Sequence, residues 1–366
     1  MKTSPPKKIA FCITCMNRLK HIRETLIRNI TDNFLPDEVE FVLLDYNSTD
    51  GLEDWVMTLN EYINSGILIY YRTKEPEIYN RSHSRNMAFR LSDAEIYCNL
   101  DADNFLGRGF AMDMVNQFKN DKDIFYTSDY RSLDMFGRIC LRTEDYIKVR
   151  GYNEILSGWG SEDVEFISRL KDTGLRQFQF MNDEYYNAIS HSNEDRISQE
   201  KISKLLKSLY ISHITPYKSE VLMINNDFTY EFGVLINNKY RYFNITDEQF
   251  KSDNWLTKEG GMNYIVIEGD IKTGRWTEIN DEIEVEYGRE TQIFRKNGTK
   301  ITDGQNVFYQ VTNSSLRSFI IMSFSNAVNT RKIQQNKRDG ASVNPKGFGK
   351  GVVYRNFDYN NTITLV

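Results

Sequence analysis

Two carboxylates, two residues apart, are the part of this sequence best suited to chemistry. Asp101 and Asp103 lie near the end of the stretch Ile96–Phe105, which indicates a buried strand that runs out of apolar residues. In an open α/β sheet, ligands bind outside the carboxyl ends of the strands. Carboxylate oxygens suit Mg²⁺ or Mn²⁺, and these ions neutralise phosphates. Because such pairs are more often solvated turn residues, the interpretation depends on their neighbours.

Two further polar clusters follow strand-like runs earlier in the chain. The first follows the alternating run Lys7–Cys15, and the second follows the nearly continuous apolar run Val39–Asp45. The carboxyl ends of parallel strands meet at one edge of a sheet, so we expect both clusters to converge with Asp101 and Asp103. The clusters consist of Thr14, Asn17 and Arg18 after the first run, and of Asp45, Asn47 and Asp50 after the second.

Strand and helix patterns alternate through the first half of the chain, which predicts an α/β domain with a mostly parallel sheet and right-handed crossovers. Further strands are expected over residues 66–71, 124–127 and 178–181, and helices over residues 21–34, 52–63, 84–91, 107–120 and 195–213. No G-x-G-x-x-G or G-K-[ST] loop occurs, so a metal would have to hold a pyrophosphate. The pattern indicates a nucleotide-binding half-domain that depends on a metal.

A tryptophan between glycines precedes an acidic helix start. Gly158-Trp159-Gly160 places a large ring on a mobile backbone, and Glu162 and Asp163 open the helix that follows. Carboxylates are favoured at a helix N-terminus by the helix dipole, so an ordinary acidic first turn explains them as well as a functional site does. His191 follows the predicted strand at 178–181, and a lone histidine is usually structural.

Composition narrows the class of protein. The chain has 366 residues, which favours two domains, and 40% of them are hydrophobic, enough for a sizeable core. A net charge of -5 without a dominant basic patch argues against nucleic acid as a partner. The sequence shows no signal peptide and no stretch of about 18 apolar residues that could span a membrane. The pair Cys12-x-x-Cys15 lies inside an apolar run, which favours buried reduced thiols and a cytosolic location over a redox or metal site.

The last third changes to short alternating runs, which predicts an all-β domain of the sandwich or jelly-roll type over residues 217–366. Strands are expected over residues 230–236, 264–267, 283–287, 291–295, 307–311, 319–324 and 352–354. A carbohydrate-binding role, with Trp255, Trp276 or tyrosines as stacking platforms, competes with core aromatics plus an oligomer surface. We favour the second explanation slightly.

Residues 7–215 together resemble the GT-A fold glycosyltransferases of the family 2 type. Their second half is similar to β-1,4-galactosyltransferases and bacterial chondroitin-type polymerases. Asp45-x-Asn47-Ser48-x-Asp50 resembles the Asp-Asp-Gly-Ser-x-Asp motif that holds uracil and ribose, with Tyr46 in place of the second Asp. The other matching motifs are Thr14-x-x-Asn17-Arg18, Ser84-Arg85-Asn86, the D-x-D of Asp101-Ala102-Asp103, Gly158-Trp159-Gly160-Ser161-Glu162-Asp163, and His191.

The resemblance implies a role for each motif. Asp103 and His191 would ligate Mn²⁺ or Mg²⁺, and Asp163 would be the general base that deprotonates the acceptor hydroxyl. A base beside the acceptor implies direct displacement, and therefore inversion at the anomeric carbon. Trp159, Gly160 and Glu162 would bind the acceptor sugar. The nucleotide-sugar would contact Thr14, Asn17, Arg18, Asp45, Asn47, Asp50, Arg85, Asn86, Asp101 and Ala102.

These expectations combine into one hypothesis, with residues 1–216 as the transferase domain and residues 217–366 as the accessory domain. The chain would transfer Gal, GalNAc, Glc or GlcNAc from a UDP-sugar to a surface polysaccharide or a lipid-linked oligosaccharide. It would act in a bacterial cytoplasm, with peripheral membrane association and homo-oligomerisation through the accessory domain left open. The alternatives are a retaining transferase, a glycan-binding protein with a decayed transferase domain, and a metal-dependent nucleotidyltransferase.

Overall fold

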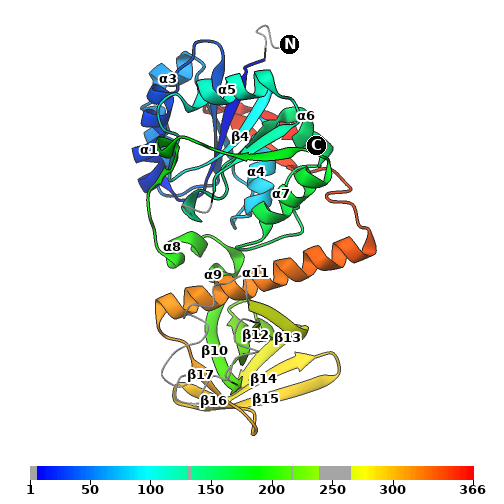
Figure 1. The fold of residues 1–366 in the computed structure, drawn as a ribbon. Coiled ribbons are helices and arrows are strands. Elements are labelled where there is room, and N and C mark those ends of the chain that lie inside the picture. The colour runs from blue at the N-terminus through cyan, green and yellow to red at the C-terminus, as the bar shows by residue number, and fades with distance from the viewer. Residues whose placement is uncertain (1–5, 130–132, 216, 239–264) are drawn as a thin grey trace. The chain divides into compact units, whose positions relative to one another are not determined.

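The computed structural model describes residues 6–129, 133–215, 217–238 and 265–366. The chain divides into two compact units (Figure 1). The first contains residues up to Ser157, Ser161–His191 and Gly340–Val366, and the second contains Gly158–Gly160 and Ser192–Asp339. The expected boundary at residue 216 differs from this division, because the chain enters the second unit after His191 and returns to the first at Gly340.

The first unit is built on a mixed sheet with the strand order β19-β18-β3-β2-β1-β4-β7-β6-β8 among the described residues. The strands β3, β2, β1 and β4 are parallel neighbours, as are β6 and β8, while β7 and the β18–β19 hairpin run antiparallel. The strands are β1 (Ile9–Cys15), β2 (Val39–Tyr46), β3 (Leu68–Thr73), β4 (Ile96–Asp101), β6 (Ile124–Thr127), β7 (Ile139–Arg142), β8 (Arg176–Gln179), β18 (Gly351–Arg355) and β19 (Asp358–Leu365), with β5 (Asn104–Phe105) and β9 (Asn187–Ala188) forming a small separate sheet. This mostly parallel arrangement confirms the predicted α/β sheet.

Helices cover both faces of this sheet (Figure 1). Alternate residues of β1 point to opposite faces, so Phe11 joins the core under α1, α2, α3 and α5, while Cys12 joins the core under α4, α6 and α7. The helices are α1 (Leu19–Asp32), α2 (Leu52–Met57), α3 (Asn60–Asn64), α4 (Arg81–Arg90), α5 (Phe110–Asn120), α6 (Thr143–Lys148) and α7 (Glu162–Asp172), with 3₁₀ turns at Leu133–Met135 and Asp183–Tyr185. Burial on both faces explains the nearly continuous apolar runs of the central strands.

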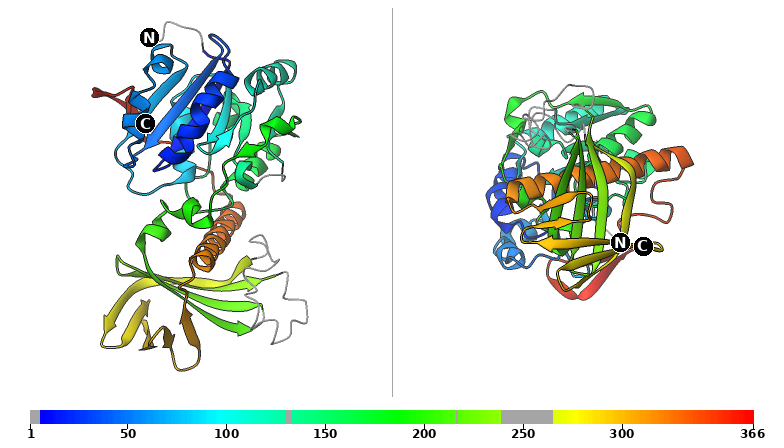
Figure 2. Two further views of the ribbon diagram at one scale, coloured as in Figure 1. Left: turned by 90° about the vertical axis from the view of Figure 1, so that its left-hand side faces the viewer. Right: turned by 90° about the horizontal axis from the view of Figure 1, so that it is seen from below.

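The second unit is a closed antiparallel barrel of consecutive strands, β10 to β17, with β10 also pairing with β17. Figure 2 shows the long helix α11 (Ser314–Asp339) lying across the β10–β13 strands. Ile320, Ile321 and Phe324 of this helix pack on Leu209 and Val221. The elements are α8 (Asn193–Ile197), α9 (Lys201–Leu205), β10 (Leu206–Thr215), β11 (Lys218–Asn225), β12 (Thr229–Asn237), β13 (Ile265–Ile279), β14 (Glu282–Tyr287), β15 (Glu290–Asn297), β16 (Lys300–Thr302) and β17 (Val307–Gln310).

The all-β prediction is therefore right in class, but the strands close into a meander barrel instead of a sandwich or jelly roll. Trp276 is only 4% exposed and donates its indole N–H to the Asn225 carbonyl, so it is a core residue and not a stacking platform. Trp255, the other proposed platform, lies outside the described residues.

Two element predictions are wrong, and a third is right about the strand but wrong about its domain. The helix expected over 195–213 is two short helices and the strand β10, because residues 206–215 pair with β11 and β17. The strand expected over 319–324 lies inside α11, where its apolar side chains pack on the outside of the barrel. The strand expected over 352–354 is β18, which pairs with β3 of the first unit instead of the barrel. Among the described residues, no helix is long and apolar enough to cross a membrane.

Candidate active site

The polar clusters predicted to converge do meet at one edge of the first unit's sheet. In the strand register, Thr14 at the end of β1 lies beside Asp101 of β4, and Cys15 lies beside Asp45 of β2. The Thr14 hydroxyl is 2.8 Å from the hydroxyl of Tyr79, a residue that the sequence analysis did not select. The carboxyl ends of three parallel strands thus supply one side of a candidate site.

The loops after β1 and β2 are tied to each other. Asn17 has a left-handed backbone (φ 55°), and its side-chain oxygen accepts the Thr49 N–H at 2.7 Å. The Asn17 N–H in turn donates to the Ser48 hydroxyl at 3.0 Å. Asp50 accepts the N–H of Leu19 at 2.8 Å, which satisfies a free donor at the N-terminus of α1. Asn17 and Asp50, expected to contact the nucleotide, therefore also fix the shape of this edge.

Asp45 lies beneath this edge as a fully buried residue. Its carboxylate accepts the Ser48 N–H and the Tyr70 hydroxyl, each at 2.7 Å. Burial raises the pKa of Asp45, although these two hydrogen bonds oppose the shift. Asn47, with φ 62°, donates its side-chain amide to the Pro76 carbonyl at 2.8 Å. Asp45 and Asn47 therefore both make hydrogen bonds that stabilise this part of the structure.

Tyr46, which replaces an Asp of the family motif, is also held in place. Its hydroxyl is 2.7 Å from Nδ1 of His83 on α4, and its ring contacts Tyr79 edge-on. Asn86, one turn further along α4, is completely buried. Its side chain donates to the Tyr152 carbonyl and the Glu154 carboxylate and accepts from the Tyr146 hydroxyl and the Tyr152 N–H, all within 2.8 Å. Asn86 therefore fastens α4 to the segment after α6.

Arg85 joins the strand edge to the acidic start of α7. Its guanidinium donates to Oδ1 of Asp163 at 2.7 Å and to Oδ1 of Asp101 at 3.3 Å. Glu162 lies 3.8 Å from both Arg85 and Arg81. The Arg85 side chain is only 6% exposed, and its guanidinium lies 5.1 Å from the ring centre of Tyr152. One buried cation thus brings together Asp101 of the D-x-D motif and the predicted base.

Asp163 has the ionisation behaviour that a general base needs. Burial raises the pKa of Asp163 to about 7, with the nearby Glu162 and Asp101 carboxylates adding to the effect and Arg85 opposing it. Arg85 is shared among three carboxylates, so it compensates each of them only in part. A base whose pKa lies near neutrality is ionised above about pH 7 and still holds a proton strongly.

Position 137, beside Arg85, leaves no room for a side chain. A Cβ atom on Gly137 would lie 2.6 Å from Nη2 of Arg85 and 2.9 Å from Oδ2 of Asp101. The Gly137 carbonyl also accepts from the Asn99 side chain at 2.8 Å, and Asn99 lies 3.4 Å from Asp101. Sequence reasoning missed Gly137, Asn99 and Tyr152, because none of them belongs to a recognisable motif and only the fold brings them to the site.

Asp103 and His191, the predicted metal ligands, face each other. Nε2 of His191 is 2.6 Å from Oδ2 of Asp103, and both side chains are largely buried. Burial by itself would raise the pKa of Asp103, but the His191 hydrogen bond and the nearby Arg18 guanidinium lower it below its usual range. Ala102 between the two carboxylates is buried, and its carbonyl accepts from Thr25 at 2.7 Å. Asp103 is therefore held as a carboxylate.

This pair fits a divalent ion in its donor chemistry. A carboxylate and an imidazole nitrogen are a set that Mn²⁺ accepts, and the remaining positions would fall to donor phosphates and water. Within the described residues, no group of three or more His, Cys, Asp or Glu side chains gathers around one point. An ion bound here would therefore depend on the nucleotide for further ligands.

Trp159 and Gly160, the other half of the predicted acceptor motif, belong to the second unit. Trp159 packs with the apolar cluster that contains α11, and Asn329 of that helix donates to the Gly160 carbonyl at 2.9 Å. Glu162 and Asp163, only two residues further on, belong to the first unit. The structure therefore brings the base to Asp101 and Arg85, but it places the predicted stacking ring with the barrel.

Comparison with known proteins gives one family match and several distant structural similarities. Residues 123–192, which include Asp163 and His191, match the profile of the N-terminal domain of galactosyltransferase. No curated protein sequence matches the chain significantly. The family match supports a glycosyltransferase.

Three solved structures illustrate the structural similarity. A mannosyltransferase from Pyrobaculum calidifontis in complex with GDP-Man and Mn²⁺ is 19% identical, with a TM-score of 0.41 over 49% of this chain and 58% of that one. S. aureus TarS 1–349 in complex with UDP is 18% identical, with a TM-score of 0.42 over 52% and 62%. The catalytic domain of Drosophila β1,4-galactosyltransferase 7 in complex with xylobiose is 14% identical, with a TM-score of 0.37 over 53% and 75%. At these values the similarity assigns no chemistry to this chain.

Proposed function

We propose that the chain is an inverting, divalent-metal-dependent glycosyltransferase. It transfers a hexose or N-acetylhexosamine from a UDP-sugar to a hydroxyl of a glycan acceptor, in the synthesis of a surface polysaccharide or a lipid-linked oligosaccharide. The observation that carries this proposal is the Arg85 bridge between Asp101 and Asp163. It holds a carboxylate with a pKa of about 7 next to the D-x-D edge.

Asp163 acts as the general base in this proposal. The bonds from Arg85 and from the Tyr152 hydroxyl both end on Oδ1, so we assign Oδ2 as the oxygen that takes the proton from the acceptor hydroxyl. As Oδ2 takes the proton, the acceptor oxygen attacks the anomeric carbon and the bond to the UDP oxygen breaks. One base and no protein nucleophile give a single displacement, which inverts the configuration.

The donor side is assigned to the strand edge. Asp103 and His191 would hold the ion, and when bound the ion would stabilise the negative charge that grows on the departing diphosphate. Arg18 and Asp101 flank this position, while Asn17, Asn47 and Asp50 keep the loops around it in shape. Glu162 and Trp159 are assigned to acceptor binding. The four cysteines are free and buried, which supports a reducing, cytoplasmic location.

The anomeric configuration of the first product tests the mechanism without knowledge of the natural acceptor. The wild type would be incubated with Mn²⁺ and, in turn, UDP-Gal, UDP-GalNAc, UDP-Glc and UDP-GlcNAc, with water as the slow acceptor. Proton NMR in the first minutes should show the β anomer appearing before mutarotation. If the α anomer appears first, the reaction retains configuration and the inverting mechanism is wrong. If none of the donors is consumed, the proposal of UDP-sugar transfer is contradicted.

A further inference from the structure

The barrel contains a pocket where two of its strands part. The strand β13 pairs with β12 along Ile265–Arg275 but with β14 only along Trp276–Ile279. Near that point the Glu286 carbonyl of β14 accepts the Tyr230 hydroxyl of β12 at 3.0 Å. The Glu286 carbonyl also lies against the backbone of Gly274 on β13. Only glycine fits there, because a Cβ on residue 274 would lie 2.1 Å from the Glu286 oxygen. The resulting cavity has a volume of about 230 Å³.

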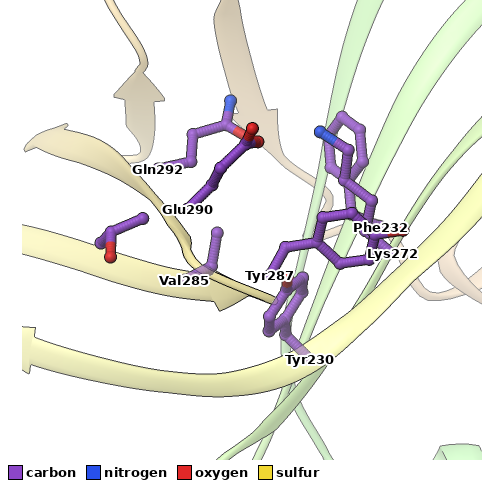
Figure 3. A pocket seen from close by; sticks show the side chains of 8 residues that line it. Tyr230, Phe232, Lys272, Val285, Tyr287, Glu290 and Gln292 are labelled. Carbon is purple, nitrogen blue, oxygen red and sulfur yellow. The ribbon is translucent and has the colours of Figure 1, made fainter.

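The lining of this pocket combines aromatic rings with polar side chains (Figure 3). Tyr230, Phe232 and Tyr287 supply the rings, and the Lys272 ammonium lies 5.7 Å from the ring centre of Phe232 and 5.6 Å from that of Tyr287. The remaining lining residues are Val285, Glu290, Thr291 and Gln292. The pocket therefore offers an apolar face together with hydrogen-bond donors and acceptors around it.

The mouth of the pocket is exposed to solvent. Tyr287 is 39% exposed at the tip of the β14–β15 hairpin, and Glu290 and Thr291 next to it are also exposed. By contrast, Tyr230, Phe232 and Val285 at the base belong to the interior core of the barrel. A ligand can thus enter past Tyr287 and reach rings that the core holds rigidly.

We propose that this pocket binds one pyranose ring of a glycan. The C–H groups on one face of a pyranose are apolar and match the negative face of an aromatic ring, while its hydroxyls need donors and acceptors at the rim. Lys272 supplies donors, and Glu290, Thr291 and Gln292 supply acceptors. The volume lies below the range of roughly 300–1,000 Å³ that is typical of drug-sized ligands, which fits a single ring with the rest of the glycan outside. This binding is independent of the proposed transfer reaction.

Saturation-transfer NMR on the full-length protein tests the proposal, with EDTA present and UDP absent. The probes are trisaccharides of glucose, galactose, N-acetylglucosamine and N-acetylgalactosamine. The wild type should transfer saturation to ring protons of at least one probe, and Tyr287→Ala should weaken its affinity at least tenfold. The matched control is Tyr309→Ala, since Tyr309 is 48% exposed on β17 with Lys300 4.9 Å from its ring, but does not line the pocket.

Two further variants distinguish binding in this pocket from binding at the candidate active site. Lys272→Met should weaken the same probe, whereas Asp163→Asn should bind it like the wild type even if the proposed transfer function is wrong. The proposal is overturned if no probe binds the wild type or if Tyr287→Ala binds as well as Tyr309→Ala. It is also overturned if sedimentation shows that Tyr287→Ala turns an oligomer into a monomer, because the pocket would then hold a second copy of the chain.

Discussion

Replacing Asp163 with asparagine removes the proposed base while preserving the shape of the site. Asparagine keeps an oxygen that can accept from Arg85 and Tyr152, so the fold should survive. It cannot take a proton from an acceptor hydroxyl. General-base catalysis is worth about 10²–10⁴-fold, so we expect kcat to fall by about that factor while the affinity for UDP stays unchanged.

The pH dependence of the wild type gives the second half of this prediction. The pKa of Asp163 is raised to about 7, so the carboxylate is ionised above that pH and protonated below it. At pH 5 about one molecule in a hundred would carry the active form, and kcat should rise about tenfold per pH unit up to pH 7. The asparagine variant should lack this rise.

The assay is the release of UDP from the donor that the wild type consumes, measured from pH 5 to 9 for both proteins. Asp172→Asn is the matched control, because Asp172 lies on the same helix but is exposed at its far end. The reasoning is refuted if Asp163→Asn keeps more than a tenth of the wild-type kcat. It is also refuted if the variant retains the acid limb of the pH profile.

Three further predictions concern the residues around the base. Arg85→Met should lower the free energy of unfolding by about 3–5 kcal/mol in urea titrations, because it leaves the largely buried Asp163 without its cation; a loss under 1 kcal/mol would contradict the bridge. His191→Ala should reduce the Mn²⁺-dependent affinity for UDP at least tenfold by calorimetry. It should also lower thermal stability at neutral pH, because the largely buried Asp103 carboxylate loses its hydrogen bond; equal affinity for UDP would remove His191 from the metal site. Asn86→Ala should lower the free energy of unfolding by about 1–3 kcal/mol, because its buried partners lose their hydrogen bonds. The Kd for UDP should stay unchanged; a specific loss of UDP affinity would indicate that Asn86 contacts the nucleotide directly.

The sheet of the first unit was predictable because its central strands are apolar on both faces. The runs Ile9–Cys15 and Val39–Tyr46 carry few polar residues before the strand ends, so their positions and the convergence of their polar ends followed from sequence. The pairing of β18 with β3 could not be predicted from the sequence, because the two strands are far apart in the chain and no local pattern specifies such a partner.

The errors in the second unit have a common cause. A short apolar run such as Phe319–Phe324 is equally compatible with a strand and with a buried helix segment, and here the polar residues around it continue the helix α11. Leu206–Thr215 also has apolar residues at a spacing that suits a helix, but pairing with β11 and β17 makes it a strand. In both cases a short run of apolar residues did not by itself distinguish a strand from a helix.

The candidate site was predictable in its carboxylates but not in what connects them. The D-x-D pair stands out by its spacing at the end of a strand, whereas Asp163 and His191 were assigned through the resemblance to glycosyltransferases. Arg85 was expected to contact the nucleotide, while its bonds to Asp101 and Asp163 depend on how α4 and α7 pack on the sheet. The raised pKa of Asp163 is likewise a consequence of burial, which no spacing in the sequence reveals.

Calorimetric titration of UDP into the full-length protein, first with Mn²⁺ and then with EDTA, tests most directly whether the strand edge is a metal-dependent donor site. We predict binding with Mn²⁺ that is lost with EDTA, and lost in Asp103→Ala as well. Equal binding in EDTA would contradict the role of the Asp103–His191 pair. No binding in either condition would contradict the proposal that this chain uses a UDP-sugar.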